Sequence, residues 1–91
     1  MRMRKMRNLE PRMAACDAYR IDDAAARKGN WRQLKPDCTA LWVEVGCGKG
    51  KFTAETAAAN PDVLLIAVER CREAVVVAME KAKAMGLTNV F

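Results

Sequence analysis

Two short apolar runs with a helical pattern between them dominate the second half of the chain. Residues 41–45 and 63–68 are rich in Leu, Val and Ile, and the alanine-rich stretch 51–59 lies between them. Apolar runs of this length are typical of buried parallel strands, because the connecting helices cover such strands on both faces. We therefore expect strand, helix and strand in that order.

A second helix is predicted after the second strand, at about residues 72–85. Its apolar residues recur at helical spacing and are expected to face the core: Val75, Ala78, Met79, Ala82 and Met85. Gly86 is a suitable helix stop, and Asn89-Val90-Phe91 begins a third predicted strand. This β-α-β-α-β start predicts an α/β fold, the N-terminal part of a Rossmann-like doubly wound sheet.

The predicted sheet is one-sided. A doubly wound sheet ordinarily continues on the other side of its first strand, and 91 residues leave no room for that half. We therefore expect an incomplete domain with an unpaired strand edge and uncovered apolar faces, which is an aggregation liability.

The first part of the chain has a different character. Residues 1–36 are polar and basic and form a predicted N-terminal arm, with a helical candidate near Pro11 to Tyr19. Pro36-Asp37 marks the expected boundary, and residues 37–91 form the α/β unit.

The net charge of +5 is concentrated in this arm. Residues 1–35 hold ten Lys and Arg against four Asp and Glu, whereas residues 36–91 hold six against seven. The cations nearest the start are the candidate nucleic-acid contacts: Arg2, Arg4, Lys5 and Arg7. A basic arm of this kind suits the phosphates of a nucleic acid.

Composition narrows the remaining classes of protein. No apolar run reaches the 18 residues of a membrane span and no signal peptide is recognisable, so we expect a cytoplasmic protein without membrane contact. The chain has no histidine, and its four cysteines form no Cys-x-x-Cys pair, which argues against a metal site. The cysteines are interpreted as small buried thiols, and Trp31 and Trp42 as packing residues.

Most of the candidate chemistry lies in the segment Glu44-Val45-Gly46-Cys47-Gly48-Lys49-Gly50. Alternating glycines let the backbone turn sharply and approach a ligand closely. The helix predicted to follow would turn its unsatisfied N–H groups toward whatever the loop holds. We interpret this segment as a cofactor-binding loop.

Glu69 is the second candidate. It ends the second apolar run, roughly 20 residues beyond the loop, where an acid in doubly wound sheets takes the ribose hydroxyls of a nucleotide. A carboxylate has two acceptor oxygens, which suits the two donors of a vicinal diol.

The glycine spacing bears on the class of cofactor. A Walker loop requires a glycine where Val45 stands and a Ser or Thr where Phe52 stands, so the loop argues against ATP. A dinucleotide fingerprint requires its third glycine at the position of Lys51, which weakens nicotinamide binding without excluding it.

The glycine loop is similar to that of class I S-adenosylmethionine-dependent methyltransferases in general. More specific motifs are spread over the whole chain: Met-Arg-Met-Arg-Lys at the start, Lys28-Gly29-Asn30-Trp31-Arg32, the Lys-Gly-Lys-Phe continuation of the loop, Asn60-Pro61-Asp62, Val68-Glu69, the 81–87 segment and Asn89-Val90. Together these segments resemble one family, the bacterial tRNA (guanine-N7)-methyltransferases.

The resemblance implies S-adenosylmethionine as cofactor and tRNA as partner, with methyl transfer to N7 of a variable-loop guanine. It implies that the methionine part of the cofactor meets Glu44, Gly46, Cys47, Gly48 and Gly50, and that Glu69 binds its ribose. The family's adenine-reading and guanine-binding residues would lie beyond Phe91, so we expect the 91 residues alone to be inactive.

Three other functions are compatible with the residues. The chain could belong to another class I methyltransferase, or be a basic nucleic-acid-binding module without catalysis. A dinucleotide-binding half-domain is the third alternative.

Overall fold

The computed structural model describes residues 6–91, which form a small α/β unit with a two-stranded parallel sheet. The helices and strands predicted within residues 41–85 are confirmed to within one residue. The elements are α1 (Leu9–Ala15), β1 (Ala40–Val45), α2 (Lys51–Ala59), β2 (Val63–Val68) and α3 (Arg72–Ala84). None of the helices in this described part is long and apolar enough to cross a membrane.

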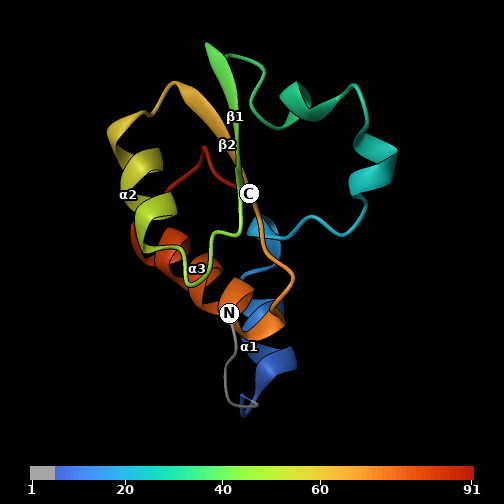
Figure 1. Ribbon diagram of the computed structural model, residues 1–91, viewed down its shortest axis with the longest axis vertical. Helices are drawn as coiled ribbons and strands as arrows, with labels where there is room; N and C mark the ends of the chain where they lie inside the picture. Colours follow the sequence, from blue (N-terminus) through green and yellow to red (C-terminus); the bar gives the residue numbers. More distant parts are fainter. Residues whose placement is uncertain (1–5) are drawn as a thin grey trace.

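The sheet has the predicted order and direction. Strands β1 and β2 pair in parallel from Ala40 opposite Val63 to Val45 opposite Val68. The third predicted strand begins on the other side of β2, where Val90 forms a parallel bridge to Leu65. Leu65 donates its N–H to the Asn89 carbonyl at 2.9 Å and accepts from the Phe91 N–H at 3.0 Å. Figure 1 shows this red C-terminal segment beside the golden strand β2.

The prediction that β1 is buried is wrong. Trp42, Val43 and Val45 are 42%, 60% and 81% exposed, whereas the first four residues of β2 are buried. The physical reason is that, within residues 6–91, β1 pairs only with β2. Since side chains alternate along a strand, Val43 and Val45 share one face, and the half-exposed Val68 lies opposite Val45 on it. The expected uncovered apolar face is therefore confirmed.

Helix α3 is the centre of the packing. Its Val76 and Met79 are buried against Met13 and Cys16 of the N-terminal segment. Its Ala82 joins a second cluster with Ala57 of α2, Leu65 of β2 and Val90. The predicted apolar stripe is thus confirmed at Met79 and Ala82, but Met85 is 49% exposed. Gly86 ends the helix with a left-handed φ of 65°, as predicted.

The N-terminal segment docks on α3. Helix α1 is shorter than predicted, and a 3-10 turn over Asp17–Tyr19 follows it. Arg12 forms a two-point ion pair with Glu80, its Nε lying 2.9 Å from Oε2, and this pairing lowers the pKa of Glu80. Lys83 donates from Nζ to the Ala15 carbonyl at 2.7 Å. The division of the chain at residues 36 and 37 stays a prediction.

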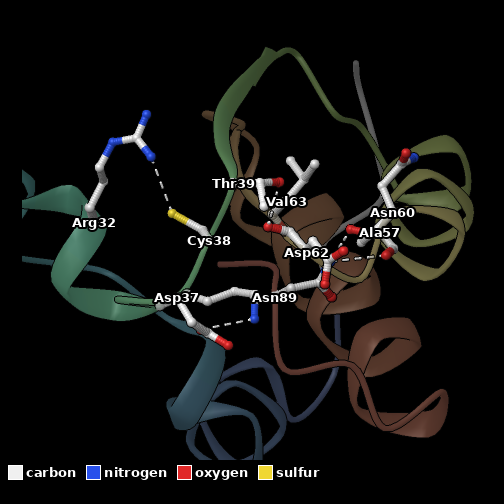
Figure 2. A network of polar contacts seen from close by, with 10 residues as sticks. Arg32, Asp37, Cys38, Thr39, Ala57, Asn60, Asp62, Val63 and Asn89 are labelled. Atoms are coloured by element: carbon white, nitrogen blue, oxygen red, sulfur yellow. Dashed lines mark hydrogen bonds and ion pairs between the residues drawn. The ribbon is translucent and has the colours of Figure 1, made fainter.

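One buried amide links the start of β2 to the third strand. The Asn89 side chain is 4% exposed and donates to the carbonyls of Ala57, Asn60 and Val63 at 2.9, 3.0 and 3.0 Å (Figure 2). These carbonyls lie at the end of α2, in the following turn and at the start of β2. Asn89 therefore fixes how the chain turns from α2 into the sheet.

We predict that Asn89→Ala lowers the free energy of unfolding by about 1–3 kcal/mol, because it removes the buried amide hydrogen bonds to three carbonyls. Asn30→Ala is the control, since Asn30 is exposed and donates only weakly, over 3.5 Å, to Lys28. Its effect should stay within about 0.5 kcal/mol. Urea unfolding of both variants checks this, and equal effects would contradict the role given to Asn89.

Candidate functional site

The glycine loop rests against the end of β2. Gly46 and Cys47, which follow β1 directly, donate their N–H groups to the Val68 carbonyl at 2.7 and 3.2 Å. The carboxyl ends of both strands therefore meet at one edge of the sheet. In open parallel sheets this edge is where ligands bind.

Glu69 holds two loops together. Its Oε1 accepts from the Gly48 N–H and its Oε2 from the Cys71 N–H, both at 3.0 Å. The hydrogen bond from Cys71, followed by that from Gly48, lowers the pKa of Glu69 below its ordinary value of 4.5. Each carboxylate oxygen keeps a second lone pair for another donor. Glu69 is thus an ionised, fixed acceptor at the strand ends.

Glu44 is held from the helix that follows the loop. The Thr53 hydroxyl of α2 donates to Glu44 Oε1, and Thr53 itself is 4% exposed. Sequence reasoning missed Thr53, and no local signal marks it, because the contact depends on how α2 packs against β2 and α3. The result is a Glu44 carboxylate with a defined position.

Cys47 lies within the field of both acids. Burial raises the pKa of its thiol, and the negative charges of Glu44 and then Glu69 raise it further. The thiol therefore stays protonated and neutral near pH 7, which makes Cys47 a poor nucleophile. The interpretation of the cysteines as buried thiols is confirmed for Cys16, but it is wrong for the other three, which are only partly buried: Cys38, Cys47 and Cys71.

The outer two glycines of the loop serve different purposes. Gly46 has a φ of +78°, but a Cβ there would meet nothing within 4 Å. At Gly50, which also has a positive φ, a Cβ would lie 2.5 Å from Ala78 Cβ and 2.8 Å from Ala78 Cα. Gly50 therefore allows α2 to approach α3, in addition to shaping the turn.

Two cavities open at this edge. The larger, about 440 Å³, is lined by Cys47, Gly50 and Glu69, and the smaller, about 260 Å³, by Gly46 and Glu69. Of the six cofactor candidates, Glu44 and Gly48 line neither of the two cavities. The larger volume lies within the roughly 300–1,000 Å³ of small-molecule sites. The cofactor roles given to the six residues from sequence stay predictions.

The nucleic-acid candidates are only partly within the structure. Arg7 is exposed, whereas Arg2, Arg4 and Lys5 lie outside the described residues. Among residues 6–91, no three His, Cys, Asp or Glu side chains gather where they could hold a metal ion.

The parallel strands, the glycine loop and the acids at the strand ends are features of a nucleotide-binding α/β protein. The family model described as "Putative methyltransferase" matches residues 39–91, which include all of these features. The chain belongs to this methyltransferase family, whose activity requires a methyl donor.

Curated relatives give a more particular resemblance. The chain is 39% identical over 90 residues to the tRNA (guanine-N(7)-)-methyltransferase of Geobacillus kaustophilus, covering 99% of the chain and 42% of the relative. It is 40% identical over 81 residues to the enzyme of that name from Ruminiclostridium cellulolyticum, covering 89% and 34%. It is 34% identical over 90 residues to the tRNA (guanine-N(7)-)-methyltransferase of Streptococcus thermophilus, covering 99% of the chain and 42% of the relative.

These comparisons confirm the family resemblance seen in the sequence. The chain spans at most 42% of the length of these three relatives. What their names say about activity and substrate therefore comes to this chain only as a proposal.

We predict that Gly50→Ala destabilises the protein more than Gly46→Ala. Both variants force a left-handed conformation on alanine, at about 1–2 kcal/mol. Only Gly50→Ala also pushes a methyl group into Ala78, which adds about 1–3 kcal/mol of overpacking. Denaturant unfolding measures both, and an equal loss of stability would refute the contact with Ala78 as the reason for glycine.

We also predict a pH dependence that belongs to Glu69. Because its folded pKa is lowered, its contribution to stability is fully present above about pH 4.5, its ordinary pKa, and is lost as the pH falls through the folded pKa. Wild type should therefore be more stable than Glu69→Gln at pH 6, and the two should converge in acid. Thermal unfolding from pH 6 to pH 2 tests this, and a difference that persists at pH 2 would contradict it.

Proposed function

We propose that residues 37–91 form the first half of a Rossmann-like, S-adenosylmethionine-binding domain, and that the protein is a tRNA (guanine-N7)-methyltransferase. The names of the curated relatives support the reaction and the substrate. The observation that carries the cofactor is the fixed carboxylate of Glu69 at the strand ends, with Glu44 nearby.

The residues present fit this cofactor. Glu69 is ionised, and both of its oxygens retain acceptor capacity for the two ribose hydroxyls. Glu44 and Glu69 both influence Cys47, so two negative charges lie around the loop that would hold the methionine part. A sulfonium and an ammonium are stabilised by such a field, whereas the phosphates of ATP or NAD are repelled by it.

Methyl transfer to guanine N7 depends mainly on how the two reactants are positioned. When bound, S-adenosylmethionine supplies a methyl group on a positively charged sulfur, which is a strong electrophile. Guanine N7 already carries a lone pair, so the protein needs no general base and gains rate by aligning the two reactants. The loop and Glu69 orient one reactant. Cys47, kept as a neutral thiol, does not compete for the methyl group.

The N-terminal segment would meet the nucleic acid. Arg7 is exposed near the start of the described residues, and in the sequence it continues the basic series Arg2, Arg4 and Lys5. We propose that these cations follow tRNA phosphates, with a salt dependence of about −0.7 to −0.9 per phosphate neutralised. A guanine in an open loop suits this reaction, because N7 faces the deep and narrow major groove of paired RNA.

The test is a chimera. Residues 1–91 replace the matching part of the Geobacillus kaustophilus relative, and transfer of a tritiated methyl group from S-adenosylmethionine to unmodified tRNA is measured. We expect transfer to guanine N7. In the chimera, Glu69→Gln should raise the Kd for S-adenosylmethionine roughly 10- to 100-fold, which corresponds to lost hydrogen bonds to a charged group.

Glu55→Gln is the matched control. Glu55 is an exposed acid on α2, so its removal changes the net charge equally but touches neither cavity. A chimera that methylates only acceptors other than tRNA would refute the substrate. Equal cofactor affinity of Glu69→Gln and Glu55→Gln would refute the role of Glu69.

A further inference from the structure

The segment between Tyr19 and β1 forms an additional wall of the site. At the beginning of the segment, the Tyr19 hydroxyl donates to the Leu87 carbonyl at 2.7 Å. This hydrogen bond fixes the segment to the turn that follows α3. At its end, Thr39 donates its N–H to the Asp62 carbonyl at 2.8 Å, beside the start of β2. In Figure 1 the 3-10 turns Ala24–Arg27 and Trp31–Leu34 lie to the right of the strands, away from α2 and α3.

A tight turn positions Trp31 in this segment. Lys28 has φ −51° and ψ 122°, Gly29 has φ +81°, and the Asn30 N–H bonds to the Arg27 carbonyl at 2.7 Å. These angles define a type II turn, which requires a positive φ at its third residue and so favours glycine there. A Cβ at Gly29 would meet nothing within 4 Å, so backbone conformation, and not space, is the reason for glycine. Trp31 follows directly.

Trp31 and Glu69 line the same cavity of about 440 Å³. Ile21 and Val68 contribute apolar surface to it, and Trp31 is only half-buried. Trp42 is not among the lining residues, and it is 42% exposed. An indole ring and a carboxylate that can hold ribose hydroxyls therefore share one cavity, and the chain's other tryptophan does not.

We propose that Trp31 is a stacking surface for a purine base, presented to the cavity by the Arg27–Asn30 turn. This replaces the interpretation of Trp31 as a packing residue, and it rests on the proposed function. Purines have large π-faces, and a half-buried indole offers them a rigid partner. The purine is either the adenine of the methyl donor or the guanine of the acceptor, and the experiment separates the two.

The test uses the two tryptophans as matched reporters in the 91-residue chain. Trp42→Phe leaves Trp31 as the single emitter, and Trp31→Phe leaves Trp42. S-Adenosylhomocysteine and guanosine 5′-monophosphate are titrated separately into each variant. We expect saturable quenching in Trp42→Phe and none in Trp31→Phe. A response to S-adenosylhomocysteine identifies adenine as the base on Trp31, and a response to the guanine nucleotide alone identifies guanine.

Calorimetry of the same purine ligand supplies the affinities. Trp31→Ala should weaken binding roughly 5- to 150-fold, as expected for one lost base stack, and Trp31→Phe should restore most of it. Gly29→Ala should weaken binding with Trp31 still present, because the turn no longer presents the ring. Circular dichroism of each variant verifies that it is folded.

Two results would overturn the inference. Unchanged affinity in Trp31→Ala, with Glu69→Gln impaired, would refute the stacking role and leave the proposed function standing. If wild type binds neither ligand while folded, both proposals fail for this chain.

Discussion

The clamp made by Glu69 is the constraint on which the site depends. One carboxylate accepts an N–H from the glycine loop after β1 and another from the start of α3 after β2. Neither connection could move without breaking a charge-assisted hydrogen bond, which is stronger than a neutral one. The same hydrogen bonds lower the pKa of Glu69 and keep it ionised. The Glu69 carboxylate thus both holds the two loops together and supplies a negative charge at the strand ends.

Helix α3 connects the residues around Glu69 to the rest of the α/β unit. It contacts Gly50 of the loop through Ala78, the sheet through Ala82, and the N-terminal segment through Val76 and Met79. The glycine loop, the sheet and the start of the N-terminal segment are therefore positioned relative to one helix. A change in the packing of α3 is expected to displace both the glycine loop and Tyr19, because packed interiors transmit displacements instead of absorbing them.

Sequence reasoning succeeded where the signal is local. The apolar run 63–68 and the helical spacing in 72–85 define β2 and α3 without reference to any partner. Sequence reasoning failed where burial and contacts depend on which elements pack against each other. The exposure of Val43 and Val45 depends on which elements cover β1. The hydrogen bond from Thr53 to Glu44 depends on how α2 is placed, and the cavity shared by Trp31 and Glu69 depends on residues far apart in the chain. The glycine spacing predicts that Gly50 lets the loop approach a ligand, but the close approach of Gly50 to Ala78 is a packing constraint that no spacing rule distinguishes.

The glycine loop is flanked by acidic side chains, whereas the N-terminal segment is basic. The proposed cationic methyl donor would be stabilised by the acids of the loop, whereas the proposed polyanionic acceptor would be stabilised by the basic N-terminal series. Arg72 lines the larger cavity and by itself would oppose a bound cation, but it forms an ion pair with Glu10 of α1. Both side chains are more than half exposed, so the pair contributes little to stability. Its effect is local: docking of α1 brings a negative charge beside Arg72, which makes the N-terminal segment part of the electrostatics of the site.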